Sequence, residues 1–242
     1  MRNYELETQQ RTAFIRDVLQ SAGASGIVFG NSGGKDSALV GILCKMACDD
    51  TVGFTLPCGS KQNYEQDISD AQAVAVQFGI ACKTIDLQHT QTALVQAVGA
   101  QAKITGSALA NIAPRLRMAA LYAVAGSENR LVAGTDNRSE IHMGYFTKWG
   151  DGAYDFNPIA DLTVTEIYEF LRYLGAPASV IDKAPSAGLY EGQTDEAEMG
   201  ISYKSLDNFL LYGKTNPIEQ IVIDKYHNSS AHKRKMPVIF GD

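Results

Sequence analysis

The segment from Gly30 to Ser37 concentrates residues whose types and spacing suit the binding of a polyanion. An apolar run precedes it and a second apolar run of helical length follows it, so the segment is expected to lead from a strand into a helix. N–H groups at a helix N-terminus bind phosphate oxygens, and glycine lets the backbone approach them. The residues are Gly30, Asn31, Ser32, Gly33, Gly34, Lys35, Asp36 and Ser37.

Two familiar phosphate-binding patterns do not match this segment. A Walker loop ends in Gly-Lys-Ser/Thr, whereas Asp36 follows Gly34 and Lys35 here. The dinucleotide fingerprint Gly-x-Gly-x-x-Gly also fails, because Ser32 stands where its second glycine is required. The alternative to a binding loop is a turn of glycine and serine that caps a helix, with Asp36 in the first turn for its charge.

Asp36 also indicates a bound cation. A carboxylate beside phosphate groups is repulsive unless a cation lies between them, and Mg²⁺ takes carboxylate and phosphate oxygens together. A second polar loop, from Gly134 to Glu140, follows another apolar run. We expect Glu140 to be the second ligand of Mg²⁺ and Thr135 to contact the anion, although Gly-Thr-Asp also occurs in ordinary turns.

Apolar runs alternate with helical patterns up to Gly134, which predicts an α/β fold with a doubly wound parallel sheet and helices on both faces. In the strand order 3-2-1-4, the loops after the first and fourth strands flank one crevice at the carboxyl ends of the strands. The expected strands are 26–30, 51–56, 82–87 and 130–134, and the expected helices are 4–22, 38–47, 68–78, 90–100 and 109–125.

The later part of the chain has a different pattern. Residues 135–163 are expected to be rich in loops, and 184–200 to form a flexible surface loop that could act as a lid. A helix is expected at 165–174 and two more near 203–211 and 216–227. Because no linker divides the chain, we expect a single domain over 1–242.

Composition limits the partners. The net charge of −6 gives no general attraction to nucleic acid or to an anionic membrane, and no apolar run approaches the length of a membrane span. Basic residues gather at Arg115 and Arg117 and again at 232–235, which suits a small anionic ligand. The four scattered cysteines fit a reducing compartment, so we expect a cytoplasmic protein without a signal peptide.

The pattern Ser32-Gly33-Gly34-x-Asp36-Ser37 resembles the signature of the N-type ATP pyrophosphatase, or PP-loop, superfamily. This resemblance implies a Rossmann-like, adenine nucleotide alpha hydrolase-like fold whose loop holds the β,γ-pyrophosphate of ATP. Further segments look like those of ammonia-dependent NAD synthetases. They are Asn111 to Ala123, Gly134 to Gly152 with its Phe-Thr-Lys-x-Gly-Asp-Gly stretch, Leu174 to Pro177, Thr194 to Glu196, Gly200 to Tyr203 with Asp207, and His232 to Arg234.

The family resemblance implies a carbon–nitrogen ligase that converts deamido-NAD, ATP and ammonia into NAD, AMP and pyrophosphate through an acyl-adenylate. It implies a homodimer with the deamido-NAD site at the interface. Gly30 to Ser37, Thr135 and Ser186 would bind ATP, and Asp36 and Glu140 would bind Mg²⁺ and serve catalysis. The residues implied for deamido-NAD are Arg115, Lys148, Asp155, His232 and Lys233.

Two positions depart from the family pattern. The family usually places a lysine for ATP where Val164 stands, and Lys183 is a possible substitute. Ser186 stands where a threonine usually contacts ATP, a change that keeps the hydroxyl. The chain is expected to be too short for an additional glutaminase domain, so the nitrogen donor is expected to be free ammonia, although a separate glutaminase could deliver it. The acids at 195, 196 and 198 could bind ammonium.

Other interpretations remain open at this point. Another PP-loop ligase, such as a tRNA-modifying enzyme, would be expected to carry a basic surface and extra cysteines. A nucleotide-binding sensor without turnover is favoured only by Val164. Arg115 could be a surface charge, the run 232–235 a solvated tail, Lys148 a surface pair with its neighbour Trp149, and Asp155 the cap of a turn.

Overall fold

The computed structural model describes residues 2–59, 64–182 and 195–237, with a parallel sheet of four strands at its centre. The strand order is β3-β2-β1-β4, and every pairing is parallel. This confirms the predicted doubly wound α/β class and strand order. The carboxyl ends of β1 and β4 therefore meet at one crevice. The strands are β1 (Gly26–Gly30), β2 (Thr51–Thr55), β3 (Ala81–Thr84) and β4 (Arg130–Ala133).

Successive side chains of β1 enter two cores on opposite faces of the sheet. Ile27 and Phe29 are buried in one core, and Val28 is buried in the other. In the register of the sheet, Val28 lies beside Val52 on one neighbouring strand and Val132 on the other. Because both faces are covered, this strand is apolar at every position between its glycines rather than at alternate ones.

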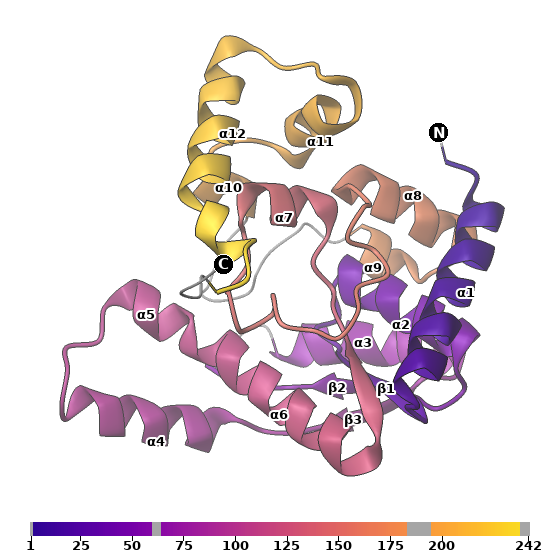
Figure 1. Ribbon diagram of the computed structural model, residues 1–242, viewed down its shortest axis with the longest axis horizontal. Coiled ribbons are helices and arrows are strands. Elements are labelled where there is room, and N and C mark those ends of the chain that lie inside the picture. Colours follow the sequence, from indigo (N-terminus) through magenta and orange to yellow (C-terminus); the bar gives the residue numbers. More distant parts are fainter. Residues whose placement is uncertain (1, 60–63, 183–194, 238–242) are drawn as a thin grey trace.

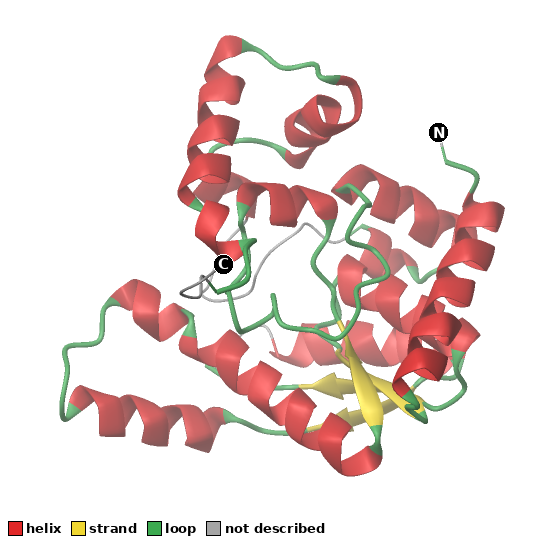
Figure 2. Ribbon diagram, viewed as in Figure 1, coloured by secondary structure: helices red, strands yellow, loops and turns green. Residues whose placement is uncertain are grey.

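Helices cover the two faces as Figures 1 and 2 show. The face that receives Phe29 is covered by α1, α2, α3, α8 and α9, and the opposite face by α6, against which α4 packs. No helix in the described part of the chain is long and apolar enough to cross a bilayer. The bounds are α1 (Tyr4–Ala22), α2 (Lys35–Ala47), α3 (Tyr64–Phe78), α4 (Gln88–Gly99), α5 (Gly106–Ala110), α6 (Ile112–Glu128), α8 (Val164–Leu174) and α9 (Ala178–Ile181).

The helix ends follow local capping chemistry. At the start of α1, the side chain of Asn3 accepts a hydrogen bond from the Leu6 amide, and Gly23 ends the helix with φ +63°. Thr163 and Glu166 form a reciprocal capping box at the start of α8. The helix α2 begins at Lys35, three positions before the predicted start at 38, so the end of the anion-binding segment belongs to its first turn.

A smaller lobe stands above the carboxyl ends of the strands (Figure 1). It encloses a third core that includes Met143, Val164, Tyr203, Leu206 and Ile223. Residues 135–163 were expected to be rich in loops, and they contain the short helix α7. The elements of this lobe are α7 (Arg138–Met143), α10 (Asp195–Met199), α11 (Tyr203–Tyr212), α12 (Pro217–Ser229) and the 3₁₀ turn η1 (Ala231–Lys233).

The expectation of a flexible surface loop over 184–200 is wrong for its last part. Asp195 and Met199 on α10 are 2% and 3% exposed, because Met199 joins the third core and Asp195 accepts a hydrogen bond from the hydroxyl of Tyr203. Residues 184–194 lie outside the described residues, and the proposed lid stays a prediction. The assignment of a single domain to 1–242 also stays a prediction.

Candidate active site

The phosphate-binding segment leaves the carboxyl end of β1 and turns at once into α2. Gly33 has φ +73°, a conformation that favours glycine, and Gly34 forms the N-cap of the helix. The hydroxyl of Ser32 accepts a hydrogen bond from the Gly34 amide at 3.3 Å and lies 3.2 Å from the hydroxyl of Ser37. The Ser37 hydroxyl donates to the carbonyl oxygen of Gly34 at 3.0 Å, so both serines lie at the N-terminus of α2, where backbone N–H groups favour an anion.

Asn31 fixes the base of this turn. Its side chain is buried; the amide oxygen accepts from the Gly33 amide at 3.3 Å, and the amide nitrogen donates to Sγ of Cys82 on β3 at 3.3 Å. Asn31 therefore shapes the loop from below. Both polar atoms of its side chain contact protein groups, and these contacts hold the loop in its conformation.

The predicted metal ligands come together although they lie in the first turns of two separate helices, Asp36 on α2 and Glu140 on α7. Nζ of Lys35 lies 2.6 Å from Oδ2 of Asp36 and 4.0 Å from Oε1 of Glu140. The Asp36 and Glu140 side chains are 17% and 16% exposed, so both are largely shielded from water. Two carboxylates that share one cation within these distances offer the oxygen ligands that Mg²⁺ prefers, and the residues present fit that ion.

Asn137 connects the two carboxylates. Its side-chain nitrogen donates to Oδ1 of Asp36 at 3.1 Å, and its side-chain oxygen accepts from the Glu140 amide at 3.0 Å. Its own backbone N–H donates to Oε2 of Glu140 at 3.0 Å, which completes a capping box at the start of α7. Asn137 was not among the predicted site residues, although Asn-x-x-Glu is a recognisable capping pattern.

The electrostatics of this cluster favour a cation. Burial and the neighbouring carboxylate of Asp36 raise the pKa of Glu140 well above its usual value. Burial raises the pKa of Asp136 in the same way, with added repulsion from Asp151 and Asp36. A positive ion would offset this repulsion, so the cluster suits a cation better than an anion.

Four of the five residues predicted for deamido-NAD gather at a second wall. Nη2 of Arg115 donates to the carbonyl oxygen of Lys148 at 3.3 Å. The ammonium group of Lys148 donates to the carbonyl oxygens of His232 and Lys235, each at 2.8 Å. In return, Lys233 donates to the carbonyl oxygens of Gly144 and Phe146, each at 2.8 Å. We call these four bonds, two from each lysine, the lysine clasp.

The fit between these segments depends on Gly144, which ends α7 with φ +67°. A Cβ atom at Gly144 would collide with the side chain of Ser230, so only glycine allows the segment after α12 to lie this close. Arg234 adds hydrogen bonds to the last carbonyl groups of α7. The run 232–235 is therefore tied to the loop after α7, and the interpretation as a solvated tail is wrong.

Other predicted residues have different surroundings. The carboxylate of Asp155 accepts hydrogen bonds from the Val132 amide at 2.7 Å and from the Tyr122 hydroxyl at 3.2 Å, beside β4 rather than at the lysine clasp. Thr135 is half-buried where the chain leaves β4. Val164 is buried in the third core. Ser186 and Lys183 lie outside the described residues.

The acids of α10 that were expected to bind ammonium have protein partners. Asp195 accepts from the Tyr203 hydroxyl at 2.9 Å, and Glu196 accepts from the Tyr203 amide at 2.7 Å. Glu198 accepts from the Tyr145 hydroxyl at 2.6 Å. These contacts hold α10 against α11 and the loop after α7, which is a structural use of all three carboxylates.

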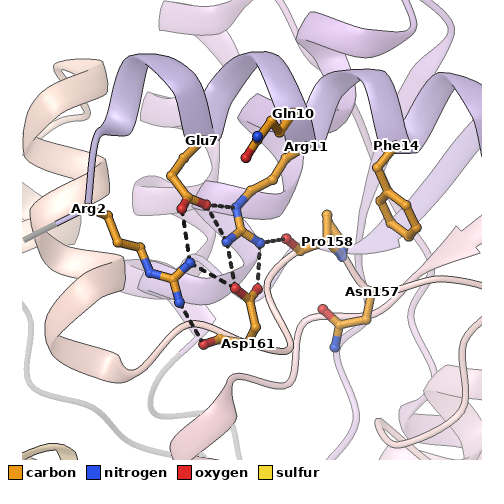
Figure 3. Close-up of a pocket in the computed structure, with 8 residues that line it drawn as sticks. All are labelled: Arg2, Glu7, Gln10, Arg11, Phe14, Asn157, Pro158 and Asp161. Atoms are coloured by element: carbon orange, nitrogen blue, oxygen red, sulfur yellow. Dashed lines mark hydrogen bonds and ion pairs between the residues drawn. The ribbon is translucent and has the colours of Figure 1, made fainter. Parts of the chain in front are cut away.

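A polar hollow of about 360 Å³ lies on the outside of the molecule between α1 and the segment 157–161 (Figure 3). Arg11 pairs with Asp161 at 2.6 Å and with Glu7 at 2.6 Å, and Arg2 pairs with Glu7 at 3.0 Å. The charged groups that line this hollow satisfy one another. They fasten α1 to the loop before α8, and they are not among the predicted site residues.

Comparison with known proteins identifies this architecture. The model of the NAD synthase family matches residues 7–237. An NH(3)-dependent NAD(+) synthetase of Carboxydothermus hydrogenoformans is 43% identical over 240 residues, covering 98% of each chain. An NMN synthetase structure from Francisella tularensis has a TM-score of 0.94 at 36% identity and full coverage of both chains. An NH3-dependent NAD synthetase from Campylobacter jejuni has a TM-score of 0.81 at 30% identity, covering 99% and 100% of the chains.

These matches extend over the sheet, the anion-binding turn and the lobe above it, and they agree with the family resemblance seen in the sequence. The chain belongs to the NAD synthase family.

Proposed function

We propose that this protein, a ligase of the NAD synthase family, amidates deamido-NAD with ammonia at the expense of ATP and releases NAD, AMP and pyrophosphate. The curated relatives at about 40% identity, which are named NH(3)-dependent NAD(+) synthetases, support this activity. The observation that carries it is the meeting of Asp36 and Glu140, from the loops after β1 and β4, directly beside the phosphate-binding turn.

A carboxylate is a poor acyl donor, and the proposed reaction activates it before ammonia attacks. The nicotinate carboxylate attacks the α-phosphorus of ATP to give an acyl-adenylate and pyrophosphate, and ammonia then displaces AMP. The turn at Ser32 to Ser37 binds the departing pyrophosphate through N–H and hydroxyl donors. Mg²⁺, held by Asp36 and Glu140, would neutralise charge on the phosphates. Asn137 keeps the two carboxylates aligned for that purpose.

The wall at the lysine clasp is the proposed site of the acid substrate. Arg115, Lys148 and Lys233 bring three cationic groups together there, with His232 exposed beside them. Cationic groups suit the phosphate and carboxylate groups of deamido-NAD. Asp155 lies on the edge of β4 and is proposed to contact the substrate from that side.

A homodimer fits the exposed surface of the arm formed by α4 and α5. No side chain of α4 is buried, and Leu94, Val98 and Leu109 are 37%, 40% and 42% exposed. A helix with an exposed apolar stripe is typical of an interface. We propose that the same arm of a second copy covers it, close to α6, which carries Arg115.

A second candidate substrate is the corresponding mononucleotide. The structural match to an NMN synthetase has the TM-score of 0.94, above the 0.81 of the NAD synthetase from Campylobacter jejuni. The acid precursor of NMN carries the same nicotinate carboxylate and lacks the adenylate half of deamido-NAD. The chemistry at Asp36, Glu140 and the phosphate turn would be unchanged.

The test supplies ATP, Mg²⁺, ammonium and equal concentrations of deamido-NAD and deamido-NMN, and follows NAD, NMN and pyrophosphate together. Formation of NAD and pyrophosphate in equal amounts, abolished in Asp36→Ala, supports the proposal. Preferential formation of NMN assigns the mononucleotide instead. Pyrophosphate without either amide would mean that the enzyme adenylates another acid, and no pyrophosphate would favour a nucleotide sensor.

A further inference from the structure

Lys35 occupies an unusual place for a lysine in a phosphate-binding turn. It stands at the variable position of the pattern Ser-Gly-Gly-x-Asp-Ser and is the first residue of α2. Its side chain is 6% exposed, and its ammonium group contacts Asp36 at 2.6 Å and approaches Glu140 at 4.0 Å. The positive charge of Lys35 therefore lies beside both proposed metal ligands.

An aromatic wall closes the other side of this ammonium group. Nζ of Lys35 lies 5.7 Å from the centroid of the Tyr203 ring, within the range of a cation–π contact. Tyr203 is 3% exposed and is held by its hydroxyl contact with Asp195. The ammonium group of Lys35 is thus in contact with Asp36, Glu140 and an aromatic ring of α11 at the same time.

We propose that Lys35 is a built-in counter-cation that Asp36 and Glu140 share until a metal arrives. One ammonium group balances part of two carboxylate charges in the metal-free protein. An arriving divalent ion then competes with this resident cation. The inference rests on the proposed metal site, and it makes Lys35 a competitor of the metal rather than a phosphate ligand.

The test replaces Lys35 with methionine, which keeps most of the length and removes the charge. We expect Mn²⁺ alone, titrated by electron paramagnetic resonance without nucleotide, to bind Lys35→Met roughly tenfold or more tightly than wild type, because no ammonium group competes for the carboxylates. Lys45→Met is the matched control, since Lys45 lies on the same helix, pairs with exposed Asp49 and is remote from the site in sequence.

Thermal unfolding gives a second measurement that needs no turnover. In EDTA, Lys35→Met is expected to melt roughly 6–20 °C below wild type, because removing one partner of a buried ion pair leaves unbalanced charge. Saturating Mg²⁺ should recover more of this loss in the variant than it adds to wild type. If the variant does not fold, Lys35→Met/Glu140→Gln, which restores the charge balance, is expected to fold.

Several results would overturn the inference. Equal or weaker Mn²⁺ binding by Lys35→Met, with poorer ATP binding, would make Lys35 a phosphate ligand. Failure of Lys35→Met/Glu140→Gln to fold would also contradict the charge-balance argument. Asp36→Asn separates this inference from the proposed function, because Mn²⁺ binding that persists in Asp36→Asn would show that the metal site itself is misplaced.

Discussion

Asn137 and Asp36 are joined by a 3.1 Å hydrogen bond from the Asn137 side-chain nitrogen to Oδ1 of the aspartate, across 101 positions of sequence. The bond links the loops that follow β1 and β4. Since Asn137 also caps α7 and holds Glu140, a single fully buried amide fixes the positions of both proposed metal ligands. The two loops are thus one unit, although the sequence places them far apart.

Asn137→Ala is expected to lower the free energy of unfolding by about 2–3 kcal/mol, from the lost cap and the lost bond to Asp36. It should also weaken Mn²⁺ binding, because the carboxylates are no longer held in register. Urea unfolding and a metal titration would measure the two effects.

Asn216→Ala is the matched control, since Asn216 forms the same capping box at the start of α12. It should lose about 1 kcal/mol of stability and keep its affinity for Mn²⁺. Similar metal binding by both variants would show that Asn137 acts only as a helix cap.

Asp207 ties the upper lobe to the site. Its carboxylate, 2% exposed, accepts from the Ser139 hydroxyl at 2.6 Å and from the backbone and hydroxyl of Thr165 at 2.7 and 2.6 Å. Asp207→Ala should cost about 2–4 kcal/mol, because the fully buried Ser139 hydroxyl on α7 and the Thr165 donors on α8 lose their acceptor. Asp224→Ala, at an exposed position on α12, should change stability by less than about 0.5 kcal/mol. Comparable unfolding midpoints for the two variants would exclude this role.

The lysine clasp predicts a selective effect on the acid substrate. Lys148→Met and Lys233→Met should each raise KM for deamido-NAD roughly tenfold or more, which corresponds to one lost charged contact of about 1.5 kcal/mol. KM for ATP should change little, because the phosphate turn is separate. Lys225→Met on the exposed side of α12 provides the control. Equal increases in both KM values would indicate general disruption of the lobe.

His142 predicts an acid-sensitive lobe. Its ring stacks on His227 with centroids 4.3 Å apart, and burial, helped by the nearby basic groups, lowers the pKa of His142 to about 4. In the unfolded chain, His142 binds a proton as the pH falls below its usual pKa of about 6.5, whereas in the folded protein it does so only near pH 4. The free energy of unfolding therefore falls as the pH drops through this window.

Because the His142 ring is only half-buried, we expect a loss of about 1 kcal/mol between pH 7 and pH 5. In urea unfolding, the free energy of unfolding of His142→Gln should fall by about 1 kcal/mol less than that of wild type between pH 7 and pH 5. His89→Gln, on exposed α4, should keep the wild-type dependence. Identical slopes for wild type and His142→Gln would reject the assignment.

The arm of α4 and α5 predicts the oligomeric state. Leu94→Asp with Val98→Asp should convert a dimer into a monomer in sedimentation experiments, because four buried charges per dimer would be required at the interface. Val76→Asp, an 85% exposed position on α3, should leave the dimer intact. A wild-type protein that sediments as a monomer at all concentrations would rule out the proposed homodimer.

The sheet could be predicted from sequence because its strands are short, apolar and separated by helices. The strand order that was assumed for a doubly wound sheet agrees with the structure, and the bounds of β1 match at Gly26 and Gly30. The short helix α7 was missed, since six residues that are mostly polar give no helical periodicity. Its start is marked only by the capping pair Asn137 and Glu140, a signal weaker than a hydrophobic stripe.

The sequence allowed the predicted site residues Asp36 and Glu140 to be placed near one another, but it did not show how they are connected. Asp36 and Glu140 could be paired because both follow strands that adjoin in the sheet. The orientation of Lys35 depends on Tyr203, which is more than 160 positions later, and no local pattern reports such a contact. The surroundings of Asp155 also could not be predicted from a local pattern, because its carboxylate accepts a hydrogen bond from the Val132 amide at the free edge of β4.

The lysine clasp has a consequence for the order of folding. The contacts from Lys233 to Gly144 and Phe146 span 89 and 87 positions, whereas β1, α2 and β2 pair within about 30 residues of one another. Closure of a long chain segment is slower than local pairing. The turn between β1 and α2 can therefore form early, whereas the Asn137–Asp36 bond, across 101 positions, and the lysine clasp both wait for later segments of the chain to return to the sheet.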